Sequence, residues 1–426
     1  MVWSCSSTPG PGLPEGGGGA SAGNGGARAG MGGSATEPGG TGGNQQAGGG
    51  QGGSTAGVSG GLGGGSSESG AGGDSAGGSV GEAGANDGGA AGSADSTPFA
   101  GECGQGWAAG GAASRPNLKG SVTPQVDKSG NWTFSFGRYR LVVAGSHGAR
   151  VIEFSIDGLN LIDATGGSTF WPSPQQNYTW PPPAEIDTAA YTAQADATSL
   201  SLTSATANVT SSTLSGLRLS VLKRFWVNAD SGVISIEYQL TNQSKTASAS
   251  WAPWEVTRVR AGGYTFAPKG PGNRTITQDS FQNPLALSVL PPAPAVGGIA
   301  WLDYPTLNPT LTQDNYINEF DGAEGWLAHA NRFGTSLLPV LFVKSFVDAP
   351  DASLPSNQAE IQLWTSGTAK PKLIEVEEQG ALQVLMPGES LTWTVHWAAC
   401  ELPNASVLSA GNLELAAFAR ALAIKP

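Results

Sequence analysis

Apolar and polar residues alternate with a period of two along most of the chain beyond residue 130. Runs rich in Val, Ile, Thr and aromatic residues are separated by Gly, Pro, Asn and Asp. In residues 233–239, Ile234, Ile236 and Tyr238 alternate with Val and polar side chains. This alternation is typical of antiparallel strands with one buried face. It predicts strands at 131–136, 139–144, 150–156, 199–203, 217–227, 233–241, 251–259, 299–304, 338–347, 359–364, 372–378 and 390–397.

One convincing helix is expected, at residues 405–423. A helix there would place these apolar side chains roughly along one side: Leu408, Leu413, Leu415, Phe418 and Leu422. No repeat of about 20–50 residues is visible, which argues against a propeller or solenoid. The pattern therefore predicts an all-β fold, a large antiparallel β-sandwich with a short C-terminal helix.

Glycine divides the chain into two parts. Residues 1–100 hold 37 of the 65 glycines, one basic residue (Arg28), and no aromatic residue between Trp3 and Phe99. A segment this poor in apolar side chains cannot offset the entropy of ordering its backbone. We therefore expect a disordered Gly-rich linker at 6–106 and a folded domain at 107–426.

The net charge of −12 excludes some partners. No basic stripe or arginine cluster is present, so nucleic acid is not expected as a partner. The sequence contains no run of about 18 apolar residues, so no transmembrane helix is expected. No phosphate loop or dinucleotide fingerprint occurs in a strand–helix context, so no cofactor is expected. The acidic stretch 314–325 lacks the EF-hand pattern and no Cys/His cluster has zinc spacing, so no metal site is expected.

Cys5 lies directly ahead of the Gly-rich segment, in the sequence MVWSCSS. Four preceding residues are too few for a secretory signal, but Ser4–Cys5 looks like the end of a bacterial lipoprotein signal. Residues 1–5 are therefore interpreted as the remnant of an export signal whose start lies upstream. Cys5 is either the lipidated residue of an exported, surface-anchored protein or an incidental terminal cysteine.

The other two cysteines, Cys103 and Cys400, bracket the predicted domain. In an oxidising compartment they are expected to form a disulfide; the alternative is two free thiols. Closing a loop between residues 297 apart would stabilise the fold by at most roughly 5–6 kcal/mol in the chain-entropy treatment.

Three segments, taken in order, resemble the galactose-mutarotase-like superfamily of β-sandwich proteins. The segment GARVIEFSIDGLNLID (148–163) is similar to the family's opening strands, and GGSTFWPSPQ (166–175) to the Gly-Gly turn that follows them. The third, EVEEQGALQVLMPGESLTWTVHW (375–397), resembles the family's C-terminal stretch. The resemblance covers about residues 120–400 and, with 177–183 and 252–259, looks most like an uncharacterised bacterial branch.

The resemblance implies a sugar site in which Glu377 matches the catalytic base of the family. Two departures weaken the catalytic part of this implication. Glu378 stands where the family usually has proline, and residues 257–268 carry no histidine where the family has a catalytic one. The resemblance therefore implies the fold and a carbohydrate partner more directly than it implies epimerase activity.

Mutarotation needs a base and an acid on either side of one sugar. Strand alternation places Glu375 and Glu377 on one face, either as a wet, paired-carboxylate sugar site or as an ordinary solvated strand. His396 is the candidate acid if its strand is the hairpin neighbour of the Glu377 strand. His147, in a glycine-flanked loop, is a candidate ligand contact, whereas His329 is more simply a core or loop residue.

Aromatic and polar residues occur together in FWPSPQQNYTWPPP, where Trp171, Gln175 and Trp180 could stack on and hydrogen-bond a sugar. The alternative is that these aromatic residues close one end of the sandwich. Glu255 and Arg258, on opposite faces of one strand, are further candidates for ligand binding, although Arg258 could instead pair with a buried carboxylate.

These observations favour an exported carbohydrate-binding protein, with a sugar epimerase as the first alternative and a ligand-free structural surface protein as the second. Fold alone does not decide among them, because function depends on the site.

Overall fold

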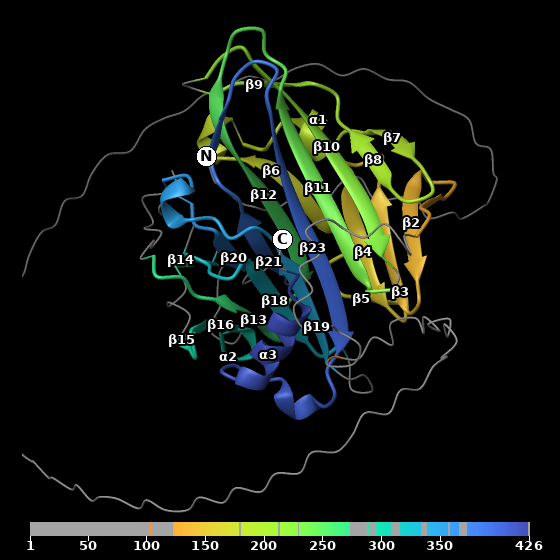
Figure 1. Ribbon diagram of the computed structural model, residues 1–426, viewed down its shortest axis with the longest axis vertical. Coiled ribbons are helices and arrows are strands. Elements are labelled where there is room, and N and C mark those ends of the chain that lie inside the picture. The colour runs from red at the N-terminus through yellow and green to blue at the C-terminus, as the bar shows by residue number, and fades with distance from the viewer. Residues whose placement is uncertain are drawn as a thin grey trace, which may run out of the picture. The chain divides into compact units, whose positions relative to one another are not determined.

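The computed structural model describes residues 103, 122–178, 180–211, 214–228, 230–272, 288–289, 295–307, 316–333, 339–356, 358–365 and 373–424. These residues form two large β-sheets packed face to face (Figure 1). The predicted all-β sandwich is confirmed.

Sheet 1 has twelve strands. Its order is β1 (Gln125–Val126), β2 (Asn131–Phe136), β3 (Tyr139–Ala144), β4 (Arg150–Ile156), β6 (Ser168–Ser173), β12 (Ala249–Arg260), β21 (Leu373–Gln379), β20 (Ile361–Thr365), β17 (Tyr316–Phe320) and β14 (Ser288–Val289), with β5 (Leu159–Asn160) beside β4 and β22 (Gln383–Leu385) beside β12. The pairing of β14 with β17 is parallel, and the other pairings among described strands are antiparallel.

Sheet 2 has eleven strands. Its order is β15 (Ala295–Val296), β16 (Ile299–Asp303), β13 (Tyr264–Pro268), β18 (Trp326–Asn331), β19 (Val340–Ser345), β23 (Ser390–Glu401), β11 (Val233–Asn242), β10 (Leu217–Asn228), β8 (Leu200–Thr203) and β7 (Thr192–Ala195), with β9 (Ala207–Val209) beside β10. The short helices are α1 (Ala184–Asp187), α2 (Tyr304–Leu307), α3 (Leu413–Leu422), η1 (Gln175–Asn177), η4 (Asp351–Ser353) and η5 (Ala405–Val407).

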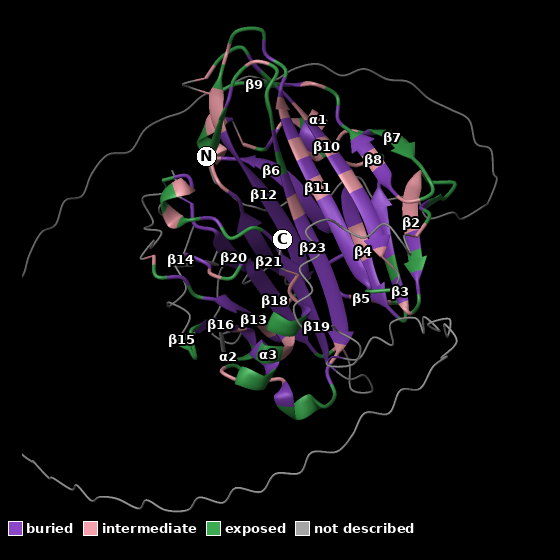
Figure 2. Cartoon of the chain, in the orientation of Figure 1, coloured by how far each residue is buried: buried purple, intermediate pink, exposed green. Residues whose placement is uncertain are grey.

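The main core lies between the two sheets, where the inward residues of each predicted alternation meet. Phe154 of sheet 1 contacts Phe342 of sheet 2 with ring centroids 5.6 Å apart, and Phe170 stacks on Tyr238 at 4.6 Å. Figure 2 shows the central strands of both sheets almost wholly buried. Their outward faces are therefore covered as well, which a simple one-face-wet sandwich does not predict.

A second apolar cluster lies on the outer face of sheet 2, beneath α3. Leu415, Ala419 and Leu422 pack there against Trp326 and Leu341. The predicted helix at 405–423 is too long, since residues 405–407 form an isolated 3₁₀ turn. The helix begins after Asn412, whose side chain accepts hydrogen bonds from the backbone N–H groups of residues 414 and 415. No helix among the described residues has the length and apolar character needed to cross a membrane.

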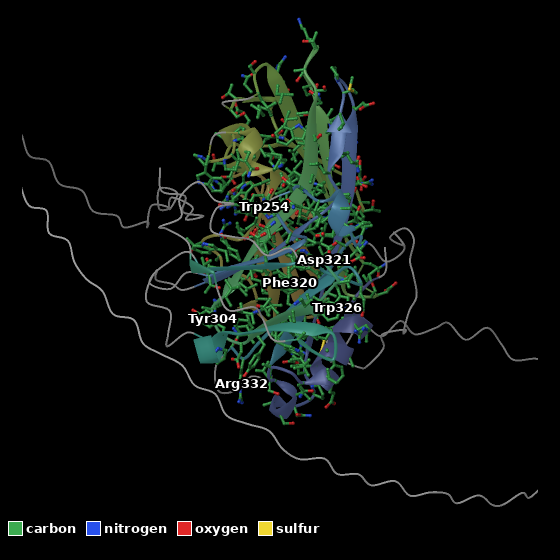
Figure 3. The ribbon with its side chains drawn as sticks, turned by 90° about the vertical axis from the view of Figure 1, so that its left-hand side faces the viewer. Trp254, Tyr304, Phe320, Asp321, Trp326 and Arg332 are labelled. Atoms are coloured by element: carbon green, nitrogen blue, oxygen red, sulfur yellow. A yellow bond between two sulfur atoms is a disulfide. The ribbon has the colours of Figure 1, made fainter. Side chains whose placement is uncertain are left out.

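The disulfide joins Cys103 to Cys400, the pairing expected from the sequence. It is drawn in yellow in Figure 3, near α3. The backbone N–H of Cys103 also donates to the carbonyl of Glu401 at 2.8 Å. Residue 103 is therefore fixed to the last strand of sheet 2.

Candidate functional site

A grid of side chains covers the outer face of sheet 1, directed away from sheet 2. Directly opposed residues of neighbouring antiparallel strands share a face, so the register of β6, β12, β21, β20 and β17 defines the grid. Its rows are Trp171–Trp254–Gln379, Thr169–Val256–Glu377–Gln362–Glu319 and Arg258–Glu375–Trp364. We call these residues the outer grid. All of them are buried.

Three tryptophans form the aromatic end of the outer grid. The ring of Trp171 lies edge-on to Trp254 at 5.2 Å and edge-on to Trp180 at 5.1 Å between centroids. Trp180, which follows η1, is half-buried and so forms part of the rim. Aromatic faces of this kind suit the apolar C–H faces of a sugar ring.

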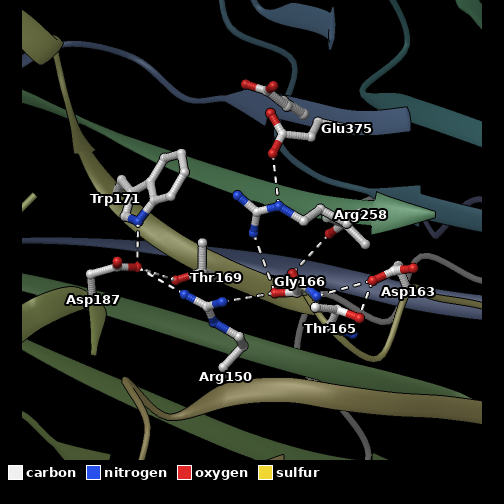
Figure 4. Close-up of polar contacts among 12 residues, drawn as sticks. Arg150, Asp163, Thr165, Gly166, Thr169, Trp171, Asp187, Arg258 and Glu375 are labelled. Carbon is white, nitrogen blue, oxygen red and sulfur yellow. Dashed lines mark hydrogen bonds and ion pairs between the residues drawn. The ribbon is translucent and has the colours of Figure 1, made fainter. Parts of the chain in front are cut away.

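Two arginines converge beside these tryptophans (Figure 4). Nη1 of Arg150 donates to the carbonyl of Gly166 at 3.0 Å, and Nη1 of Arg258 donates to the same carbonyl at 3.3 Å. Arg150 also pairs with Asp187 at 3.1 Å, and Asp187 accepts the indole N–H of Trp171 at 2.8 Å. The guanidinium of Arg258 lies 5.5 Å from the Trp171 ring centroid. Each arginine is therefore fixed on more than one side.

The two glycines before β6 make this convergence possible. A Cβ on Gly166 would lie 1.9 Å from Cδ of Arg258, so no side chain fits there. Gly167 has φ +60°, in the left-handed region that glycine adopts without strain. Asp163 closes the turn by accepting from the backbone N–H groups of Thr165 and Gly166 at 2.9 and 3.1 Å.

Glu375 and Glu377 lie side by side on the outer face of β21. Nε of Arg258 pairs with Glu375 at 2.7 Å, and the indole N–H of Trp254 donates to Glu377 at 2.8 Å. Burial raises the pKa of Glu375, although Arg258 opposes the increase. Burial raises the pKa of Glu377 well above its usual value, and the nearby charges of Glu375 and Glu319 raise it further.

The two carboxyl groups therefore form a coupled acid–base pair in which Glu377 holds the proton more firmly. This reverses the role expected for Glu377, because a protonated carboxyl donates a proton rather than accepting one.

Several buried polar atoms of the outer grid lack a hydrogen-bond partner. They are Nη2 of Arg258, the indole nitrogen of Trp364, and both the nitrogen and the oxygen of the Gln379 amide. Each of these side chains is more than nine-tenths buried. Buried polar groups are normally paired, and an unpaired one costs about 1–3 kcal/mol. A ligand with hydroxyl groups could supply the missing partners.

Five residues singled out from the sequence lie in or beside this site. Trp171, Arg258, Glu375 and Glu377 belong to the outer grid and Trp180 to its rim. The sequence offered two interpretations of Glu375 and Glu377, a wet sugar site and an ordinary solvated strand. Both expected hydrated side chains, and in that respect both are wrong. These side chains are buried rather than hydrated, because the outer face of the central strands is itself covered.

Gln175 and His147 lie at the periphery. Gln175 begins η1 and is part-exposed, while His147 lies in the turn just before Arg150. Burial lowers the pKa of His147, and the positive charge of Arg150 lowers it further, so this histidine is neutral near pH 7. Neither side chain belongs to the outer grid as the register of the described strands defines it.

Glu255 and His396 do not join the other candidates. Glu255 points between the sheets, where it accepts from the hydroxyl of Tyr238 at 2.5 Å and pairs with Lys344 at 3.1 Å. His396 is on β23 in sheet 2, where its Nδ1 lies 2.8 Å from the hydroxyl of Ser235. The condition under which His396 would act as the acid, a hairpin between its strand and that of Glu377, is therefore not met. The acid role expected for His396 lapses with it.

The third histidine also faces away from the site. Nδ1 of His329 lies 2.9 Å from the hydroxyl of Thr265, and burial lowers the pKa of His329 to about 3. Among the described residues, no group of His, Cys, Asp and Glu is arranged to hold a metal ion.

Several outer-grid and rim residues were not singled out from the sequence. They are Arg150, Asp187, Gln362, Trp364 and Gln379. Alternation with Glu375 and Glu377 could have pointed to Gln379 on the same strand. The other four come from segments whose proximity depends on strand order, which the sequence pattern does not give.

No protein-family model matches the chain, and no curated protein matches it. Similar solved structures include a galactose mutarotase-like protein from Lactobacillus casei, with TM-score 0.45, 13% identity, and coverage of 63% of this chain and 100% of that one. The chain resembles the galactose mutarotase-like proteins.

Two further structures show how far the similarity extends. A galactose mutarotase related enzyme from Lactobacillus acidophilus has TM-score 0.40 and 8% identity, with coverage of 63% of this chain and 97% of that one. A GH36 α-galactosidase from Geobacillus stearothermophilus has TM-score 0.36 and 10% identity, with coverage of 66% of this chain and 41% of that one. The function of this site therefore has to be inferred from its own side chains.

Proposed function

We propose that the chain is a carbohydrate-binding protein whose sugar site is the outer grid of sheet 1. The observation that carries this proposal is the set of buried, unpartnered polar groups beside a tryptophan cluster. Sugars combine apolar ring faces with many hydroxyls, so they match both parts of the site. The rim residue Trp180 marks the part-exposed side of the described site.

A glycan array and titration calorimetry on the full chain test the proposal, with D-galactose and D-glucose as the first soluble probes. We expect Trp171→Phe to weaken sugar binding, because it removes the indole stacking surface and the bond to Asp187. Trp226→Phe is the matched control, since Trp226 is equally buried but belongs to sheet 2. Failure of the chain to retain any glycan, or equal loss in both variants, would contradict the proposal.

A sugar epimerase is the alternative function, and the coupled Glu375–Glu377 pair is the observation that favours it. One carboxyl that holds a proton and one stabilised as an anion by Arg258 could act as acid and base at an anomeric centre. Polarimetry on freshly dissolved D-galactose tests this alternative. We expect acceleration over buffer that is lost in Glu377→Gln. Binding without acceleration leaves the binding function, and silence in both assays leaves a structural surface protein.

We also propose that the protein is exported and anchored through a lipid on Cys5, with the Gly-rich segment before Cys103 as a flexible tether; the boundary expected at residue 106 is moved because Cys103 is joined to Cys400. The MVWSCSS sequence and its glycine-rich continuation support this proposal. Intact mass and detergent partitioning of protein from the native cell test it. We expect a diacylglyceryl-type mass increase that Cys5→Ser abolishes; an unmodified aqueous-phase protein would overturn it.

A further inference from the structure

Gln379 is the least satisfied side chain of the outer grid. It is the last residue of β21, lies opposite Trp254, and is fully buried. Neither its amide nitrogen nor its amide oxygen has a hydrogen-bond partner. Its backbone is well anchored, since its N–H donates to the carbonyl of Glu360 at 2.9 Å. The unpaired groups are therefore confined to the side chain.

A buried amide with no partner destabilises the empty protein, because water would satisfy it in the unfolded chain. Methionine has a similar length and no such groups, so it would fit this position at lower cost. A glutamine that lowers stability beside Trp254 is better explained by a ligand than by packing. The amide offers donors and an acceptor together, which match two adjacent hydroxyl groups.

The charges around the grid indicate a ligand without net charge. Arg258 is paired with Glu375, and Arg150 is paired with Asp187. Glu377 adds a further acidic group, whose partner is the indole N–H of Trp254 rather than an arginine or lysine. The site therefore has no surplus positive charge with which to hold a carboxylate or phosphate.

We propose that Gln379 is a specificity-determining residue that hydrogen-bonds two adjacent hydroxyls of a neutral sugar packed against Trp254. This proposal rests on the proposed carbohydrate-binding function and names the ligand class and the residue that reads it. It requires Gln379 to be costly in the empty protein and favourable in the complex.

Gln379→Met tests both requirements in the full chain. We expect the Tm of the empty variant to rise by about 2–4 °C, the shift for relief of one unpaired polar group in a domain of this size. We expect its affinity for the neutral sugar probe to fall by about tenfold or more, the loss of one or two hydrogen bonds. Gln383→Met is the matched control, since Gln383 is exposed on β22; it should change neither value.

The probes are D-galactose, D-glucose and D-galacturonate, measured by titration calorimetry. We expect the wild type to bind a neutral hexose more tightly than the uronate. If the wild type binds a neutral hexose and Gln379→Met binds it equally well, this inference fails while the proposed function stands. A fall in Tm with unchanged affinity would make Gln379 a structural residue, and tighter binding of the uronate would overturn the ligand class. No binding of any probe by the wild type overturns both proposals.

Discussion

Strands β12 and β21 carry charged side chains on both faces, and the ion pairs and hydrogen bonds of these side chains differ between the faces. The inner cluster, between the sheets, consists of Tyr238, Glu255, Thr257, Lys344, Glu378 and Trp397. In it, Nζ of Lys344 contacts Glu378 at 2.6 Å, Thr257 Oγ1 at 2.7 Å and Glu255 at 3.1 Å. On the outer face, Arg258 has one carboxylate and one carbonyl partner and leaves Nη2 unpaired.

The difference separates charges that support the fold from charges that are available to a ligand. In the inner cluster, burial raises the pKa of Glu255, but Lys344 and the bonds from Glu378 and Tyr238 outweigh burial and leave that pKa lowered. Burial raises the pKa of Glu378 well above its usual value, and Lys344 opposes the increase. The ammonium of Lys344 is thus satisfied by both glutamates and by Thr257. The guanidinium of Arg258 in the outer grid is not satisfied in this way.

Removing the inner cation should have the largest effect. Lys344→Met leaves Glu255 without its ammonium partner in the interior, and breaking a buried ion pair costs about 3–5 kcal/mol. Urea unfolding at pH 7 measures the free energy of unfolding. Lys128→Met, at an exposed position, is the control. A loss below about 1 kcal/mol for Lys344→Met would mean that the inner cluster does not hold the sheets together.

Removing the outer cation should cost less. Arg258→Gln leaves Glu375 unpaired, but Glu375 can take up a proton as its neighbour Glu377 does. We expect a loss of about 1–3 kcal/mol in the same urea experiment. If Arg258→Gln destabilises the protein as much as Lys344→Met, the charges of the two faces contribute equally to stability and the proposed difference between them is wrong.

The pH dependence of stability should reflect carboxyls on both faces. The pKa values of Glu377 and Glu378 are raised in the folded protein, so the folded state keeps protons that the unfolded state loses above about pH 4.5. Their contribution is therefore largest below that pH and is lost as the pH rises, by at most about 1.4 kcal/mol per pH unit for each group.

Unfolding free energies measured between pH 5 and 8 test this assignment. Glu377→Gln and Glu378→Gln should each reduce the decline in the free energy of unfolding as the pH rises. Glu360, whose pKa burial raises to about 8, lies outside both clusters and should account for part of the remaining slope. Identical slopes in the wild type and both variants would show that neither carboxyl is protonated in the folded state.

The smallest expected change is at Trp254. Trp254→Phe keeps the aromatic packing but removes the indole N–H that donates to Glu377 at 2.8 Å. Since Glu377 is the protonated member of its pair, the lost bond is a neutral one, worth about 0.5–1.5 kcal/mol. Thermal unfolding near pH 7 measures it. A loss above about 3 kcal/mol would indicate that Glu377 is ionised there.

Local alternation predicted the strands and several shared faces correctly. Trp254 and Arg258 lie on one face of β12 with Glu255 on the other, as the sequence indicates. Alternation does not show which sheet a strand joins, so it left open whether β23 lies beside β21. Strand β23 lies in sheet 2, and β22, which precedes it, pairs with β12.

One strand of the site was not predicted. The resemblance identified GGSTFWPSPQ (166–175) with a turn, and proline, which cannot donate a ladder hydrogen bond, is rare in central strands. This segment contains β6, in which Pro172 lies directly opposite Pro253 of β12. Strand β4 pairs with β6 at Val151 and Ser168, away from Pro172. The backbone N–H that Pro172 lacks is therefore not required by the pairing of β6 with β4 or β12.

The Cys103–Cys400 disulfide determines how the molecule would carry tension. A pull on the segment before residue 103 reaches Cys400, on the last strand of sheet 2, through the sulfur–sulfur bond and without passing through the intervening chain. The two cysteines lie 297 positions apart, and the chain between them includes every strand of the outer grid. Once the disulfide is reduced, that pull would act instead on the backbone hydrogen bond from Cys103 to Glu401.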